Sequence, residues 1–177
     1  MGHKGARDDL TAEYVRNILD YNPETGIFRW KYRSDYPSKW NTKWAGQIAG
    51  TVTTHVAINI SKRKYLAHRL AWLLMTDKWP LKEIDHRDLN GTHNWWSNLR
   101  EATPMQNLSN QRKNKRNTSG FKGVYYSHAI GIQRPWVARI RSNGIPYHIG
   151  CFDTAEQAHA AYSEAAIRLN GEFARSS

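Results

Sequence analysis

The chain has 177 residues, a formal net charge of +11, 40% apolar residues and eight tryptophans. This length suits one domain or two small ones, and the apolar fraction excludes general disorder. The single cysteine, Cys151, excludes an intramolecular disulfide and a multi-cysteine zinc site, and it favours a reducing, cytoplasmic setting. We expect no membrane span, because no apolar run approaches roughly 18 residues. We expect no signal peptide, because the N-terminal stretch "MGHKGARDD" does not have the pattern of one.

The N-terminal half is expected to contain two helices and at least two strands. Residues 11–20 predict a helix, because Thr11 can cap it and apolar side chains follow at helical spacing. Residues 27–33 have strand character, and polar and apolar residues alternate over 55–60 as in a half-buried strand. Residues 65–75 place three leucines on one side of a second helix.

The composition of the C-terminal half changes twice along the chain, first to a polar, basic segment and then to β-rich runs followed by a helix. Thr103 and Pro104 can open a short helix, but no core-forming residues follow, so we predict a basic linker over residues 103–118. Three β-rich runs then precede a helix that starts with a capping box at Thr154 and ends near Gly171. The predicted class is α+β, with one module over residues 1–102 and a second over 119–177.

The basic charge is unevenly distributed. No acidic residue lies between Glu101 and Asp153. The same interval contains eight basic residues: Arg112, Lys113, Lys115, Arg116, Lys122, Arg134, Arg139 and Arg141. A solvated surface normally mixes both signs, so this bias indicates a polyanionic partner, of which nucleic acid is the commonest. An anionic membrane is less favoured, because these residues do not form one face of an amphipathic helix.

The segment "IDHRDLNGTHNWWSNLR" combines an Asp-His pair with spaced asparagines. It is either a polar surface loop or a metal-dependent site that cuts a phosphodiester. Such a site needs a base, and His86 suits that role because an imidazole titrates near neutral pH. Asp85 offers a hard oxygen to Mg²⁺, and on a strand its side chain points away from that of His86. Asn98 would return to the metal across a hairpin, while Asn94 would bond the intervening loop to itself.

The longer segment "DHRDLNGTHNWWSNLREATPMQN" resembles the HNH endonucleases, specifically the homing-type branch of phages and mobile introns. His86, Asn94 and Asn98 fall at the family's spacings, and "AHRLAW" upstream looks like the helix that precedes the family's motif. The resemblance implies a ββα-metal fold in which His86 is the general base and Asn94 holds the loop. It also implies one divalent cation on Asp85 and Asn98, most simply Mg²⁺ with Mn²⁺ as a substitute.

The chain departs from the family at Trp95 and Trp96, where Arg and a small or branched apolar residue are usual. These two rings are expected either to repack the site or to reach DNA. We interpret His68 as a packing or supporting residue, His93 as a solvated loop residue and Cys151 as a small core residue.

Residues 119–174 resemble the AP-two/ERF DNA-binding domain of plant transcription factors, which also occurs in phage HNH proteins. The resemblance rests on Lys-Gly-Val, Trp, Ala-Arg-Ile, Ile-Gly-x-Phe-Asp-Thr and Ala-x-x-Ala-Tyr. It implies a three-stranded antiparallel sheet in the major groove with one helix behind it. Alternation along a strand puts Arg139 and Arg141 on one face. The residues expected to contact DNA are Arg139, Arg141, Lys122, Tyr125, Ser127 and His148 on the sheet, with Arg112, Lys113, Lys115 and Arg116 in the linker.

The sequence therefore predicts a site-preferring, metal-dependent endonuclease of the homing type that acts on double-stranded DNA. One catalytic site per chain fits nicking by a monomer or weak dimer, in the host cytoplasm if a phage encodes it. The alternative is a non-catalytic DNA-binding regulator that uses the sheet alone. A more distant possibility, an RNA-directed protein, is disfavoured because the A-form major groove is too narrow for a sheet.

Overall fold

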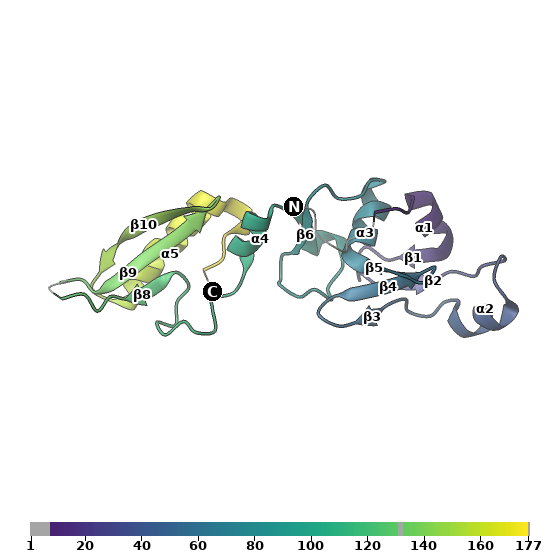
Figure 1. The fold of residues 1–177 in the computed structure, drawn as a ribbon, viewed down its shortest axis with the longest axis horizontal. Helices are drawn as coiled ribbons and strands as arrows, with labels where there is room; N and C mark the ends of the chain where they lie inside the picture. Colours follow the sequence, from purple (N-terminus) through teal and green to yellow (C-terminus); the bar gives the residue numbers. More distant parts are fainter. Residues whose placement is uncertain (1–7, 131–132, 177) are drawn as a thin grey trace. The chain divides into compact units, whose positions relative to one another are not determined.

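The computed structural model describes residues 8–130 and 133–176, and the chain divides into two compact units, Met1–Glu101 and Ala102–Ser177 (Figure 1). Each unit has its own cluster of buried apolar side chains. The architecture is mixed α/β with antiparallel sheets. Among the described residues, no helix combines the length and the apolar character needed to cross a membrane.

The first unit, called unit 1, contains small paired strands and three helices among its described residues. In chain order its elements are α1 (Ala12–Ile18), β1 (Leu19–Tyr21), β2 (Phe28–Trp30), α2 (Ser38–Trp44), β3 (Thr51–Val52), β4 (Val56–Ile60), β5 (Arg63–Leu66), α3 (Ala67–Thr76), β6 (Glu83–His86), the 3₁₀ turn η1 (Trp96–Asn98) and β7 (Leu99–Ala102). Strands β1 and β2 pair, β4 lies between β3 and β5, and β6 pairs with β7.

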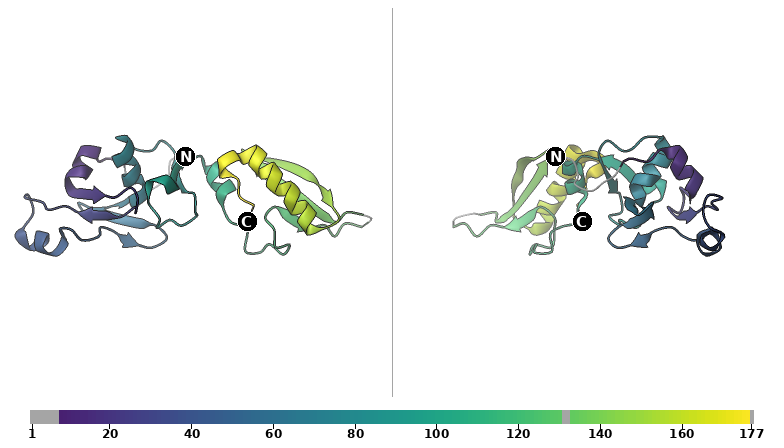
Figure 2. Two further views of the ribbon diagram at one scale, coloured as in Figure 1. Left: turned by 180° about the vertical axis from the view of Figure 1, so that it is seen from behind. Right: turned by 45° about the vertical axis from the view of Figure 1, so that its right-hand side comes forward.

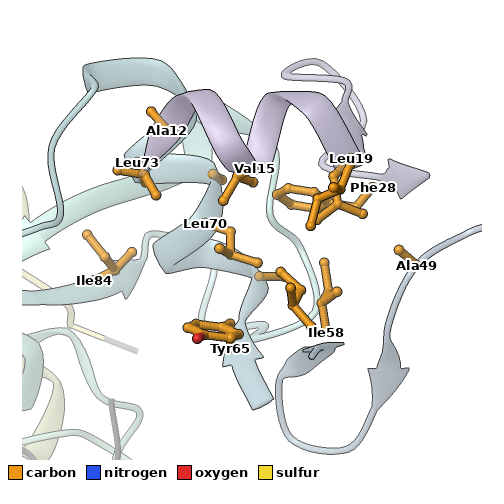
Figure 3. Packing of buried hydrophobic residues seen from close by; sticks show 14 of the residues in the cluster. Ala12, Val15, Leu19, Phe28, Ala49, Ile58, Tyr65, Leu70, Leu73 and Ile84 are labelled. Carbon is orange, nitrogen blue, oxygen red and sulfur yellow. The ribbon is translucent and has the colours of Figure 1, made fainter. Parts of the chain in front are cut away.

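The core of unit 1 forms where α1, α3 and the first strands meet. Val15 of α1 and Leu70 of α3 are fully buried and point into the same cluster as Phe28 and Ile58 (Figure 3). Their burial removes apolar surface from water, which is worth about 1.5–3 kcal/mol for each large side chain. The site-bearing hairpin β6–β7 joins this core through Ile84 and through Leu99.

Both predicted helices of unit 1 exist, but their boundaries differ from the prediction. Thr11 caps α1 by accepting a hydrogen bond from the Tyr14 amide (3.1 Å), as expected. The helix ends at Ile18, because Leu19 pairs with Trp30 in the β1–β2 hairpin. Helix α3 starts two residues later than predicted, because Tyr65 pairs with Ile58 at the end of β5. Strand pairing therefore overrides the helical periodicity of the sequence at the C-terminal end of α1 and at the N-terminal end of α3.

The second unit, called unit 2, is a three-stranded antiparallel sheet covered by one long helix. Its elements are α4 (Pro104–Asn110), β8 (Val124–Tyr126), β9 (Trp136–Ser142), β10 (Ile145–Phe152), α5 (Ala155–Asn170) and the 3₁₀ turn η2 (Gly171–Phe173). Strand β9 lies between β10 and β8. Helix α5 runs across the sheet, and Ala138 and Ile140 of β9 are buried in the same cluster as Tyr162 of α5 (Figure 2).

The segment predicted as a linker, residues 103–118, folds within unit 2 over much of its length. Thr103 and Gln106 form a capping box around Pro104, so the short helix predicted there is present as α4. The Lys122 ammonium donates hydrogen bonds to the carbonyls of Ser109 (2.7 Å) and Gln111 (2.6 Å), just where α4 ends. These bonds correct the expectation of an unstructured linker, because polar contacts replace the apolar core that the segment lacks.

We predict that Gly123→Ala destabilises unit 2 far more than Gly120→Ala. Both glycines have positive φ (+70° and +82°), so alanine costs about 1–2 kcal/mol of backbone strain at either position. At Gly123 an added Cβ would also lie 2.1 Å from the Tyr162 ring and 2.6 Å from the Arg139 carbonyl oxygen, whereas nothing lies within 4 Å at Gly120. The extra overpacking should cost a further 1–3 kcal/mol, roughly.

Native-state hydrogen exchange of the β8 and β9 amides measures this loss in the full chain. Equal losses of protection in the two variants would show that the contact between Gly123 and Tyr162 does not constrain the unit.

Candidate nuclease site

The β6–β7 hairpin buries polar side chains that would normally stay in water. Asp85, His86, Asn94, Asn98 and Arg100 are all buried. The hairpin closes when the Arg87 amide donates to the Asn98 carbonyl (2.9 Å). A buried polar group without a partner is costly, so the contacts of these side chains define the site.

His86 is oriented by Asn94. The His86 Nε2 atom lies 3.2 Å from the Asn94 side-chain oxygen. The Asn94 amide nitrogen donates to the Thr92 carbonyl (3.1 Å), which turns the oxygen towards the imidazole. Nε2 must therefore carry the proton and donate it, and Nδ1 carries the lone pair. Asn94 itself is anchored through its carbonyl, which accepts a hydrogen bond from the Tyr21 hydroxyl (2.8 Å).

Asp85 forms a buried ion pair with Arg100 on the neighbouring strand. The Asp85 Oδ2 atom accepts from Arg100 Nε (2.9 Å) and Nη2 (2.8 Å). Removing one partner of such a pair leaves an uncompensated buried charge, which typically costs about 3–5 kcal/mol. Arg100 therefore holds the carboxylate in place.

Asn98 holds the loop that follows β6. Its side-chain oxygen accepts from the Asp88 amide (3.1 Å), and its nitrogen donates to the Asp88 carboxylate (2.9 Å) and to the His93 carbonyl (2.8 Å). A loop-holding role was predicted for Asn94, which does bond the loop through the Thr92 carbonyl and also orients His86. Asn98 adds further bonds across the same loop.

The chemistry of Asp85 and Asn98 fits a hard divalent cation. A carboxylate and an amide oxygen are the donors that Mg²⁺ prefers, and the two residues belong to one hairpin. A carboxylate has about four lone-pair sites, and the Arg100 contacts involve its Oδ2 atom. The side chains of Asp85 and Asn98 have different hydrogen-bond partners, so a cation would have to add to these contacts or replace some of them.

Two further histidines surround His86. The His68 ring on α3 lies 5.1 Å from the His86 ring, and the His55 ring, which precedes β4, lies 5.7 Å from it. Burial lowers the pKa of all three imidazoles, and it lowers that of His68 most. For His86 the Asn94 hydrogen bond opposes this effect in part. His68 was predicted to have a packing or supporting role. No role was predicted for His55, because only the tertiary fold brings it close to His86.

The two adjacent tryptophans pack within unit 1. The Trp96 ring lies 5.0 Å from Trp72 of α3, and its backbone amide donates to the Pro23 carbonyl (2.8 Å). Trp95 stacks on His93, with ring centroids 4.5 Å apart. His93 in turn binds the Asp88 carboxylate at 2.5 Å. His93 was predicted to be a solvated loop residue, but this contact makes it a structural residue of the loop.

The exposed face of the unit 2 sheet carries several of the predicted DNA contacts. Arg139 and Arg141 are exposed on β9, whereas the alternating residues face α5. The Arg139 guanidinium lies over the Tyr125 ring (5.4 Å to its centroid), and His148 is its cross-strand neighbour on β10. Ser127 lies just beyond β8, where its amide donates to the Pro135 carbonyl (2.7 Å).

Other predicted contacts lie elsewhere in unit 2. Lys122 is engaged by the end of α4, so the expectation that its side chain shares the sheet face is corrected. Burial lowers the pKa of Lys122 to about 8, which explains why carbonyl partners are needed. The exposed basic residues of the segment that follows α4 are Arg112, Lys113, Lys115 and Arg116. Cys151, on strand β10, is exposed, which corrects the expectation that it is a small core residue.

Comparisons with known proteins point to one family. The profile of a family described as "HNH endonuclease" matches residues 65–109. The chain is 38% identical over 116 residues to "Uncharacterized HNH endonuclease L560" of Acanthamoeba polyphaga mimivirus, covering 63% of this chain and 56% of that protein. It is 33% identical over 92 residues to "Protein 3.8" of Escherichia phage T7, covering 52% of this chain and 73% of that protein. The chain thus spans little more than half of the mimivirus relative. No solved structure matches it.

We predict that Gly26→Ala disturbs the His86–Asn94 pair, whereas Gly46→Ala does not. Both glycines have positive φ (+72° and +79°), so the backbone strain is similar. An added Cβ at Gly26 would lie 2.3 Å from the Asn94 carbonyl carbon, while nothing lies within 4 Å of one at Gly46. Moving that backbone must displace the Asn94 amide.

Imidazole ¹⁵N chemical shifts report which ring nitrogen carries the proton. We expect the Nε2–H form of His86 in the native protein and in Gly46→Ala, and a mixture in Gly26→Ala. The same spectrum in all three proteins would contradict the proposed coupling.

Proposed function

We propose that this chain, which belongs to the HNH endonuclease family, is a metal-dependent endonuclease that nicks double-stranded DNA with His86 as its general base. The observation that supports this proposal best is the hydrogen bond from His86 to Asn94. It fixes the ring and leaves the lone pair on Nδ1, which is the arrangement that a base needs in order to take a proton from water.

Burial supports the same role. Desolvation lowers the pKa of His86, and the imidazole of His55 adds to this effect, so the ring is neutral at physiological pH. A neutral ring can accept a proton from the attacking water, whereas an imidazolium cannot. The hydrogen bond to Asn94 then stabilises the imidazolium that forms.

In this proposal Asp85 and Asn98 would hold the divalent cation, taken to be Mg²⁺ with Mn²⁺ as a substitute. When bound, such a cation neutralises charge on the phosphate and on the leaving oxygen. Arg100 keeps the Asp85 carboxylate aligned across the hairpin. The contacts of Asn98 with Asp88 keep the loop closed over the same hairpin.

Unit 2 would select and hold the DNA as an AP-two/ERF-like domain. Its sheet order and its single covering helix support this assignment, as do the two exposed arginines on β9. Arg139 and Arg141 can give bidentate contacts to guanine or clamp phosphates. The basic segment from Arg112 to Arg116 would add phosphate contacts. One base per chain fits a nick, and we propose a homing-type enzyme that acts as a monomer or weak dimer.

We predict that His86→Ala lowers the rate of plasmid nicking by about 10²–10⁴-fold while DNA affinity changes little. A base acts on a proton in the transition state and contributes little to binding of the duplex. The assay is relaxation of supercoiled plasmid in Mg²⁺, with and without chelator, alongside a binding titration. His128→Ala, at an exposed histidine of unit 2, serves as the control. Nicking by His86→Ala within a few-fold of the native rate would remove His86 as the base.

The same assay distinguishes the proposed nuclease from the alternative function, a non-catalytic DNA-binding regulator. A regulator would bind the duplex with native protein and yet leave the plasmid supercoiled in Mg²⁺ and in Mn²⁺. Metal-dependent nicking that chelator abolishes would exclude it.

We further predict that Arg139→Ala combined with Arg141→Ala weakens DNA binding and flattens its salt dependence. Each lost phosphate contact should reduce the slope of log K against log salt by about 0.9, whereas a lost base contact should cost about 1–3 kcal/mol on a preferred site only. Binding to preferred and random duplexes across a salt series separates the two roles.

Arg168→Ala is the matched control for this surface, because it removes an exposed arginine from α5, the helix behind the sheet. If the loss of DNA affinity per arginine is the same in the control and in the double variant, the exposed face of the sheet is not the surface that recognises DNA.

A further inference from the structure

Three imidazoles from separate parts of unit 1 converge on one point. His55 precedes β4, His68 lies on α3 and His86 ends β6. One ring nitrogen from each lies within 4.8 Å of the other two. Imidazole nitrogens are ligands of zinc and related transition cations, whereas Mg²⁺ prefers oxygen.

His68 provides a second, independent observation. Its side chain is only 6% exposed, and its Nδ1 atom has no hydrogen-bond partner among the described residues. A buried polar atom without a partner typically costs about 1–3 kcal/mol. An unsatisfied nitrogen in a cluster of imidazoles is the kind of group that a bound cation satisfies.

The fold holds His55 against this cluster through Gly91 in the loop after β6. A Cβ at Gly91 would lie 2.4 Å from the Thr54 carbonyl oxygen and 2.6 Å from the His55 ring. Only a glycine allows this approach, so the loop of the nuclease motif forms one wall of the histidine cluster. The cluster is therefore part of the architecture of the site and not a chance surface grouping.

We propose that His55, His68 and His86 form a binding site for a transition cation of the Zn²⁺ class, distinct from the oxygen donors Asp85 and Asn98. Tetrahedral zinc sits about 2.0–2.1 Å from each imidazole nitrogen, which places the nitrogens roughly 3.4 Å apart. Cation binding would draw the three nitrogens, which lie within 4.8 Å of one another, to that spacing. Three protein ligands leave the fourth position to water.

Occupation of this site would inhibit the enzyme. Nε2 of His86 is committed to Asn94, so the lone pair on Nδ1 is the one that a cation would take. That is the same lone pair that the proposed base uses to accept a proton. This consequence rests on the proposed function, whereas cation binding itself does not.

Metal binding is tested on the metal-free full chain without DNA. Co²⁺ reports tetrahedral coordination by visible absorption, and competition with Zn²⁺ gives the zinc affinity. We expect one Co²⁺ per chain and at least tenfold weaker binding in His55→Gln, which alters a partly exposed ring and leaves the core intact. His68→Gln should also weaken binding, with its fold checked by circular dichroism.

His148→Gln is the control for a rival site, because Cys151 Sγ lies 3.9 Å from His148 Nε2 in unit 2. Binding unchanged in His148→Gln supports the three-histidine site. Loss of binding in His148→Gln, native affinity in His55→Gln, or no Co²⁺ binding by the native chain would each overturn it.

Inhibition is measured separately, as the nicking rate in Mg²⁺ with added Zn²⁺ divided by the rate of the same protein without Zn²⁺. We expect this ratio to fall for the native chain at Zn²⁺ concentrations that leave it unchanged in His55→Gln. Equal ratios would overturn the inhibitory role. No nicking by the native chain without Zn²⁺ would instead contradict the proposed function, and the binding result would still stand.

Discussion

The hydrogen bond between His86 and Asn94 connects the chemistry of the site to the rest of unit 1. A single imidazole on a strand can turn and titrate freely, and it gains a defined proton position only from a fixed partner. Asn94 is such a partner because the Thr92 carbonyl fixes its amide and the Tyr21 hydroxyl fixes its backbone. The surrounding protein therefore decides which nitrogen of His86 carries the lone pair.

The polar residues of the hairpin satisfy one another in separate pairs. Arg100 neutralises Asp85, and Asn98 spans the loop by bonding to Asp88 and to the His93 carbonyl. This division gives each of these buried polar groups a partner within the hairpin and its loop. Trp95 stacks on His93 and Trp96 packs against Trp72 of α3, so the two rings add apolar contacts next to this polar loop.

Local features were predictable from the sequence, because short-range interactions determine them. The cap at Thr11, the helix start at Thr103 and Pro104 and the alternation along β9 are of this kind. Helix α2 was not predicted, since its position depends on Asn41, whose side chain bonds the backbone of Arg33.

The site could be predicted in part. The approach of His55 to His86 is a tertiary contact without a local pattern. The bond from Asn94 to the Thr92 carbonyl agrees with the loop-holding role predicted for Asn94, whereas its contact with His86 and the loop bonds of Asn98 depend on the loop geometry around the two asparagines. The sequence supplied the residue types of the site, whereas their pairing depends on the folded loop.

The N-terminal turn that contacts the backbone of Asn94 limits how the nuclease segment can be transferred from one protein to another. Tyr21 and Asn94 are 73 residues apart, and Pro23 and Gly26 contact the same stretch of backbone. The segment that the family profile matches, residues 65–109, does not include this turn. Transplanting that segment alone into another scaffold would carry His86 and Asn94 without the turn that contacts them, so the portable unit must include residues 21–26.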